Sequence, residues 1–152
     1  MKRGRASRCL GWGVVVGLVG LVGLAAVERV SSQAKITVTS LDEMLRANPL
    51  PATGPTAKVV GSSKTATTEL QVIEMSKIRL HHHEQEDHVL YVARGRGMAR
   101  LGDETREVKP GDIIHIPRGV VHGFAKIGEE NLVLLVAATV GWKPLEDTRF
   151  HE

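Results

Sequence analysis

The pattern of apolar residues divides the chain into two unlike parts. Residues 10–27 form one apolar run made mainly of Gly, Val and Leu. From residue 57 onward, short runs rich in Val, Ile and Leu alternate with turn signals, and no long helical period or solenoid-spaced repeat occurs. This pattern predicts an all-β domain, either a sandwich or a barrel. The expected strands lie within residues 69–80, 88–94, 97–101, 112–117, 120–127 and 132–140.

A short helix is expected before the strands. Ser40 can cap a helix over residues 41–47, and the Glu43 side chain can reach back to the Ser40 backbone N–H. Asn48-Pro49 should end it, because the residue before a proline disfavours helical backbone. We therefore divide the chain into residues 1–34, a short helix and linker over residues 35–56, and a β domain over residues 57–152.

The N-terminal part has the three regions of a secretory signal. Four basic residues between positions 2 and 8 precede the apolar run, and the small residues Ser32 and Ala34 follow it. This order predicts a signal peptide over residues 1–34, cleavage after Ala34, and export to the periplasm or the extracellular space. The alternative is an uncleaved N-terminal anchor, because 18 apolar residues come close to the roughly 20 that a spanning helix needs.

Charge and cysteine content follow the same division. The first 34 residues hold five of the 20 basic and one of the 17 acidic residues, so the remaining 118 carry a net charge of −1. The high pI therefore belongs to the leader and does not support nucleic-acid binding. The single cysteine, Cys9, also lies in the leader, so the rest of the chain forms no disulfide. The low aromatic content argues against a large stacking pocket for sugars or bases.

The candidate chemistry lies in a cluster of histidines. His81, His82, His83 and His88 fall within eight residues, and His122 follows two further turn signals. Residues two apart on a strand face the same side, so we expect His81 and His83 to face one way and His82 the other. A pair of imidazoles on one strand, with two more from neighbouring strands, can converge inside a small barrel.

The spacing of these histidines resembles the first sequence motif of the cupin superfamily. His81-x-His83 is followed by four residues, His88, six residues and Gly95. The position of His88 is where the family usually has Glu. The resemblance implies a double-stranded β-barrel, the cupin jelly roll, which commonly pairs through its outer strands into a homodimer.

A second stretch resembles the second motif of the same superfamily. It reads Gly111, five residues, Pro117-x-Gly119, two residues and His122. Only the family's common terminal Asn is missing, and Lys126 stands in its place. Fifteen residues separate the two motifs, as in small bacterial cupins, and the resemblance covers roughly residues 69–140.

The resemblance implies metal ligands at His81, His83 and His122. Four-histidine cupins exist as a variant, so His88 is expected as the fourth ligand. Glu86 is the alternative fourth ligand, because it has the same strand parity as His88. Imidazole suits Zn, Cu, Fe and Ni, and metal availability can also select Mn, so the predicted cofactor is one divalent ion of these five.

Three classes of function are consistent with such a centre. The first is a metal-dependent oxygenase of a small chelating organic substrate, similar to the quercetin-dioxygenase-like cupins. The second is a non-oxidative isomerase, lyase or decarboxylase that uses the ion as a Lewis acid. A carboxylate base at the site would favour that class, and Glu86 and His115 are the candidate acid–base groups. The third is a non-catalytic metal-binding or ligand-binding module of the cell envelope.

Cleavage of the leader can be tested directly. The basic start, the apolar run and Ser32-Gln33-Ala34 predict that the mature protein begins at Lys35. N-terminal sequencing of protein recovered from its native host should therefore read from Lys35. Intact Met1 in the membrane fraction would support the anchor instead.

Overall fold

The structure, a computed structural model, describes residues 36–139 and 141–152. The predicted signal peptide over residues 1–34 lies outside the described residues. Within them, no helix is both long and apolar enough to cross a membrane.

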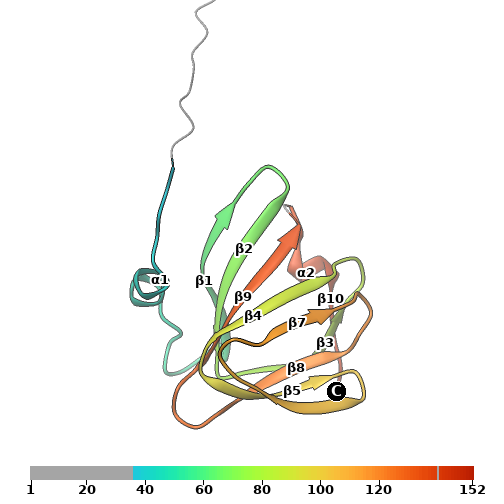
Figure 1. Cartoon of the computed structure of the whole chain (residues 1–152). Helices are drawn as coiled ribbons and strands as arrows, with labels where there is room; N and C mark the ends of the chain where they lie inside the picture. Colours follow the sequence, from blue (N-terminus) through green and yellow to red (C-terminus); the bar gives the residue numbers. More distant parts are fainter. Residues whose placement is uncertain (1–35, 140) are drawn as a thin grey trace, which may run out of the picture. The chain divides into compact units, whose positions relative to one another are not determined.

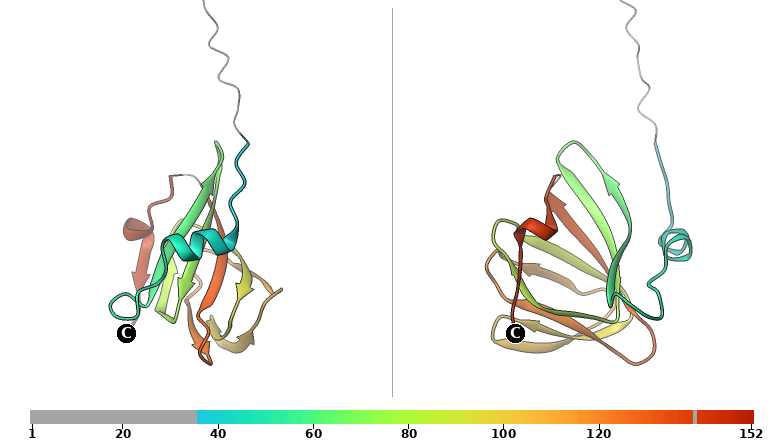
Figure 2. Two further views of the ribbon diagram at one scale, coloured as in Figure 1. Left: turned by 90° about the vertical axis from the view of Figure 1, so that its left-hand side faces the viewer. Right: turned by 180° about the vertical axis from the view of Figure 1, so that it is seen from behind.

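The described residues fold into two antiparallel five-stranded sheets that lie face to face (Figures 1 and 2). The strand order is β1-β2-β9-β4-β7 in the first sheet and β10-β3-β8-β5-β6 in the second. The predicted all-β barrel with a short N-terminal helix is confirmed. In chain order the elements are α1 (Leu41–Ala47), β1 (Ala57–Lys64), β2 (Thr68–Met75), β3 (Lys77–His83), β4 (His88–Arg94), β5 (Arg96–Leu101), β6 (Glu104–Val108), β7 (Ile113–Ile116), β8 (His122–Ile127), β9 (Leu132–Thr139), α2 (Pro144–Asp147) and β10 (Thr148–Phe150).

Helix α1 has the predicted bounds and the predicted capping box. The Ser40 hydroxyl accepts a hydrogen bond from the Glu43 backbone N–H (3.1 Å), and the Glu43 carboxylate accepts one from the Ser40 N–H (2.9 Å). The helix then places Leu41, Met44 and Leu45 on a small apolar cluster of the first sheet. Local capping and the packing of these partly buried side chains therefore support the same short helix.

The expected run over residues 69–80 is two strands. The backbone N–H groups of Ser76 and Lys77 both donate to the Thr56 carbonyl, at 2.8 and 3.2 Å, and the chain crosses there from the first sheet to the second.

The expected runs also omitted β1, β6 and β10. All three are edge strands, whose partial burial weakens the apolar pattern that reveals inner strands.

A β-bulge in β3 sets which histidines face the interior. The pairing of β3 with β8 shifts by one residue between Ile78 and His81. Ile78 packs against the core, and strict alternation from it would turn Leu80 and His82 inward. The extra residue in the bulge reverses the alternation of inward and outward side chains along β3. His81 and His83 are therefore buried and His82 is not.

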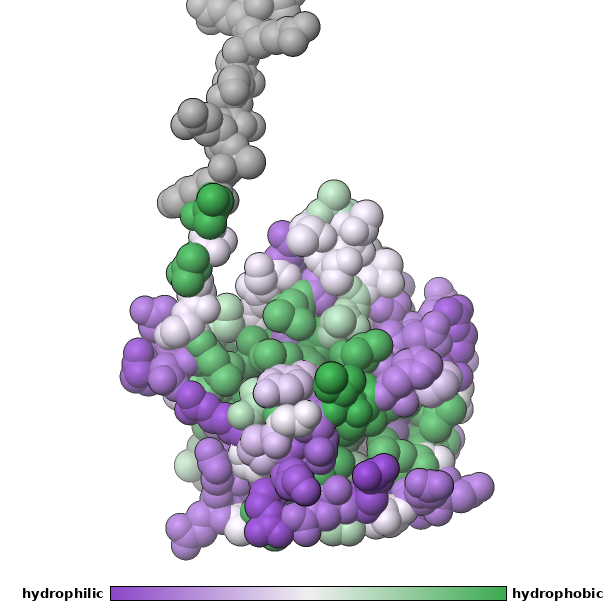
Figure 3. All heavy atoms as spheres, viewed as in Figure 1, coloured by the Kyte–Doolittle hydropathy of each residue, from purple (hydrophilic) through white to green (hydrophobic). Residues whose placement is uncertain are grey.

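Apolar side chains also gather on the outer face of the first sheet (Figure 3). Leu70, Val89, Tyr91 and Ile113 are exposed there. This face is available for the outer-strand pairing that the resemblance predicts, and the homodimer stays a prediction.

Candidate metal centre

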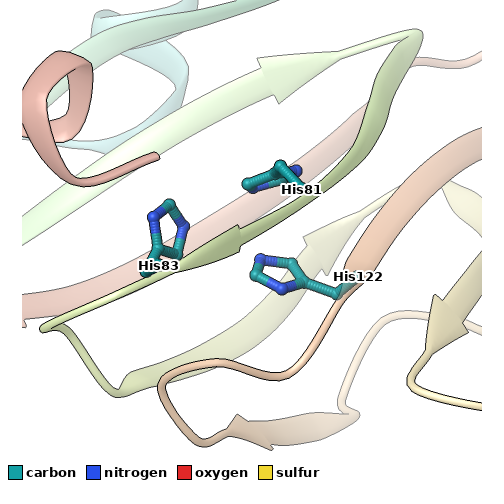
Figure 4. Close-up of side chains that lie close together, drawn as sticks. All are labelled: His81, His83 and His122. Carbon is teal, nitrogen blue, oxygen red and sulfur yellow. The ribbon is translucent and has the colours of Figure 1, made fainter. Parts of the chain in front are cut away.

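Two neighbouring strands of the second sheet bring three imidazoles together. His81 and His83 project from β3, and His122 begins β8 as the direct cross-strand partner of His81. All three are at most 5% exposed, and one ring nitrogen from each lies within 4.8 Å of the others. Figure 4 shows the three rings facing one another. These histidines are positioned to hold a metal ion.

The fourth imidazole comes from the opposite sheet. His88 is the first residue of β4, and its ring centroid lies 4.3 Å from that of His83 and 6.2 Å from that of His122. Its Nε2 atom is buried without a hydrogen-bond partner in the described part of the chain. His88 is not among the three residues whose ring nitrogens all lie within 4.8 Å of one another. Its unpaired Nε2 is nevertheless free to bind an ion beside them.

Backbone carbonyls fix two of the rings. His81 Nδ1 lies 2.8 Å from the Arg79 carbonyl, and His122 Nδ1 lies 2.9 Å from the Val120 carbonyl. A carbonyl only accepts hydrogen bonds, so Nδ1 must carry the proton in both rings. That tautomer leaves the lone pair on Nε2 free to bind a metal ion. The other ring nitrogen of a metal-bound histidine commonly donates to a carbonyl in the same way.

The interior also keeps these imidazoles neutral. Burial, together with the neighbouring His88 and His81, lowers the pKa of His83 to about 3. Burial likewise lowers the pKa values of His88 and His122 to about 4. The pKa of His81 is also lowered, mainly by burial. Neutral imidazoles are the form that binds metal ions.

The turns of the two motifs are joined directly behind the site. The Gly119 N–H donates to the His83 carbonyl at 2.7 Å. Asp87 accepts hydrogen bonds from the backbone N–H and the guanidinium of Arg118. These contacts hold the end of β3 beside the entry to β8, so Asp87 has a structural role in the turn between β3 and β4.

Glu86 faces away from the imidazole cluster. Its buried carboxylate accepts a hydrogen bond from the Thr139 N–H and lines a separate cavity. His115 is exposed on β7. His82 faces away from its two neighbours, as predicted, and its Nδ1 lies 2.8 Å from Nε2 of His151. Neither of the two candidate acid–base groups, Glu86 and His115, therefore lies at the imidazole cluster.

A cavity of about 350 Å³ opens from the four histidines into an apolar interior. Its walls include Ile73, Leu90 and Val136, and among the described residues no carboxylate lines it. Three of the chain's five aromatic residues also line it: Phe124, Trp142 and Phe150. The low aromatic content thus understates the aromatic character of this one site.

Sequence reasoning missed the C-terminal wall of the cavity. Strand β10 pairs with β3, which places Thr148 opposite His83 and Phe150 opposite His81. The Trp142 ring lies edge-to-face with those of His83 and His88, at centroid distances of 5.0 and 4.8 Å. No local motif marks these residues, and only the pairing of β10 with the histidine strand reveals them.

Comparison with known proteins relates this barrel to one family. The family model of the cupin domain matches residues 69–138. An uncharacterized protein of Methanocaldococcus jannaschii is 38% identical over 89 residues, which cover 59% of this chain and 70% of that protein.

Two solved structures show the same architecture. The polyketide cyclase RemF from Streptomyces resistomycificus is 32% identical, with a TM-score of 0.50; the match covers 58% of this chain and 63% of that one. A Klebsiella pneumoniae protein with a double-stranded beta-helix domain is 21% identical, with a TM-score of 0.60, over 78% of this chain and 99% of that one. The second likeness shows the fold alone.

Replacing single histidines by alanine should show, through metal content, which of them bind the ion. Loss of a residue that merely orients a ligand costs about 10- to 100-fold in metal affinity, so His83→Ala and His122→Ala should cost at least as much. His82→Ala is the matched control on the same strand and should leave metal content almost unchanged. Elemental analysis of the purified variants measures this, and equal loss from His82→Ala would contradict the assigned register.

The fourth position needs its own pair of variants. His88→Ala should lower metal content, because its unpaired Nε2 lies beside the cluster. Glu86→Ala should leave metal content unchanged, because the Glu86 carboxylate is bound to the Thr139 N–H. Elemental analysis measures both variants. Metal loss in Glu86→Ala but not in His88→Ala would show that the Glu86 carboxylate is the fourth ligand.

Acid should destabilise the metal-free protein before its carboxylates titrate. In the unfolded chain these histidines take up protons below about pH 6.5, whereas folded His88 and His122 do so only near pH 4 and His83 near pH 3. The unfolded state thus binds more protons, and stability must fall as the pH drops from 6.5 toward 4, by up to about 1.4 kcal/mol per pH unit per imidazole. Urea unfolding at pH 8, 6.5 and 5 measures this; equal free energies of unfolding at all three would contradict it.

Proposed function

The chain belongs to the cupin superfamily, and on that premise we propose that it is a metal-dependent oxygenase of small organic molecules that can chelate its ion. The ligands in this proposal are His81, His83, His88 and His122. The observation that carries it is the composition of the cavity, where four buried imidazoles face apolar walls without a carboxylate among the described lining residues.

The ligand set determines what such a site attracts. Four neutral imidazoles leave the full charge of a divalent ion uncompensated inside a poorly solvating interior. A substrate that binds as an anion through two oxygen atoms, such as an enolate or a phenolate, neutralises that charge. When bound, an iron or manganese ion supplies Lewis acidity to the chelated anion and redox chemistry with O2.

The protein's own side chains then bind and shield the substrate. Ile73, Leu90 and Val136 offer apolar surface to its carbon skeleton, and Phe150, 53% exposed, stands where the cavity meets solvent. None of the described residues that line the cavity is a carboxylate that could take a proton from the substrate, so the proposed substrate is one acidic enough to ionise on binding. This requirement favours 1,3-diketones and phenols.

The proposed reaction is a dioxygenation. One carbon–carbon bond of the substrate breaks, both atoms of one O2 enter the products, and all the electrons that reduce O2 come from the substrate. No external reductant is required, and none needs a binding site of its own.

A specific likeness supports a second function. The polyketide cyclase RemF is 32% identical to this chain, so a non-oxidative reaction that uses the ion only as a Lewis acid, including ring closure, is the alternative. Both candidates use the same imidazoles and the same cavity, and they differ in whether O2 is consumed.

The distinguishing experiment combines metal identity with O2 uptake. Protein purified without added metal should contain iron or manganese and should consume one O2 per molecule of diketone or phenol converted. His83→Ala should lose this activity and His82→Ala should keep it. Full turnover under strict anaerobiosis would remove the oxygenase and leave the Lewis-acid reaction. A redox-inert ion with no turnover in air or without it would instead indicate a binding module.

We also propose that the mature protein works outside the cytoplasm. The leader-like residues 1–34 support this proposal. The absence of cysteine from residues 35–152 is compatible with it, since no free thiol is left to oxidise there.

A further inference from the structure

We propose that Thr148 and Asp147 are positioning residues that keep the proton of the His83 imidazole on Nδ1, so that Nε2 is free to bind the ion. The inference rests on His83 being a ligand in the function proposed above. It assigns a role to the C-terminal segment over residues 142–150, which lies beyond the cupin-domain match over residues 69–138.

His83 differs from its neighbours in the partner of its Nδ1 atom. The Nδ1 atoms of His81 and His122 face backbone carbonyls, which can only accept hydrogen bonds and so fix the tautomer. His83 Nδ1 instead lies 3.2 Å from the Thr148 hydroxyl. A hydroxyl can donate or accept, so Thr148 alone would allow the proton on either ring nitrogen.

Asp147 supplies the missing bias. Its Oδ2 atom lies 3.9 Å from His83 Nδ1, and both side chains are only 5% exposed. This distance is too long for a direct hydrogen bond. It is short enough for a buried negative charge to favour N–H, rather than a lone pair, on the near side of the ring. The same charge stabilises the positive charge that a bound divalent ion induces on the imidazole.

Asp147 is itself held firmly in its ionised form. Trp142 Nε1 donates to Oδ2 and the Gln85 backbone N–H donates to Oδ1, both at 2.8 Å. Burial raises the pKa of this carboxyl, but the hydrogen bonds outweigh burial and hold the pKa below its usual value. The Glu84 N–H also donates to the Asp147 carbonyl, which fixes the backbone of the segment behind His83.

Trp142 connects this carboxylate to the rest of the site. Its indole N–H points to Asp147, while its ring lies edge-to-face with His83 and His88. The same Asp147 carboxylate therefore holds Trp142 in the cavity wall and biases the His83 tautomer. If Asp147 had only a structural role, it would hold Trp142 without affecting the tautomer.

The tautomer can be measured without any metal. Long-range 1H–15N correlation spectra of the metal-free protein report which nitrogen of each imidazole carries the proton. The wild type should show Nδ1–H at His81, His83 and His122. Asp147→Asn should move a substantial fraction of His83 alone to Nε2–H. It should also lower zinc affinity, measured by chelator competition, by about 10- to 100-fold.

Three further variants make the test specific. Glu146→Gln removes a charge from the same helix, but Glu146 is 70% exposed and pairs with Lys143, so it should behave as wild type. Thr148→Val should lower zinc affinity, and Thr148→Ser, which keeps the hydroxyl, should restore it. The Thr148 pair decides the question if Asp147→Asn fails to fold.

The outcomes separate this inference from the proposed function. An Nδ1–H tautomer of His83 that persists in Asp147→Asn and Thr148→Val, with zinc affinity within about twofold of wild type, would overturn the positioning role. A wild-type protein with the Nδ1–H tautomer but no affinity for any divalent transition metal would count against the proposed metal centre alone.

Discussion

The structure depends on burying four neutral imidazoles between two sheets. Each ring is at most 5% exposed, and burial lowers the pKa of every one of them. In the absence of a ligand such a cluster destabilises the folded state. Unpaired buried nitrogens and the loss of histidine protonation on folding both cost free energy. A metal ion bound between the rings would convert this cost into binding energy.

The rest of the barrel holds this cluster together. The bulge in β3 turns His81 and His83 inward, and the hydrogen bond from Gly119 to the His83 carbonyl brings His122 beside them. Gly95 has a left-handed backbone (φ +68°), and a Cβ there would collide with the Asn131 carbonyl, so the glycine that ends the first motif is required where β4 leads into β5. Gly111, the first residue of the second motif, likewise has a left-handed backbone (φ +98°), which favours glycine.

Much of this arrangement could be predicted from the sequence. The capping box of α1, the inner strands and the opposite facing of His82 follow from local patterns that the structure confirms. The break at Ser76 could not be predicted, because β2 and β3 form one continuous apolar pattern although they belong to different sheets. The C-terminal wall could not be predicted either, since Thr148 meets His83 through the pairing of β10 with β3, and Trp142 and Asp147 reach His83 from the segment that precedes β10. Short-range periodicity carries no information about such distant contacts.

The number of histidines on the ion tests the central claim most directly. X-ray absorption spectroscopy at the edge of the bound metal counts imidazole ligands through the multiple scattering of their rings. Four imidazole nitrogens near 2.1 Å in the wild type, and three in His88→Ala, are the predicted result. Three imidazoles plus a carboxylate in the wild type, or the same count in both proteins, would contradict a four-histidine centre.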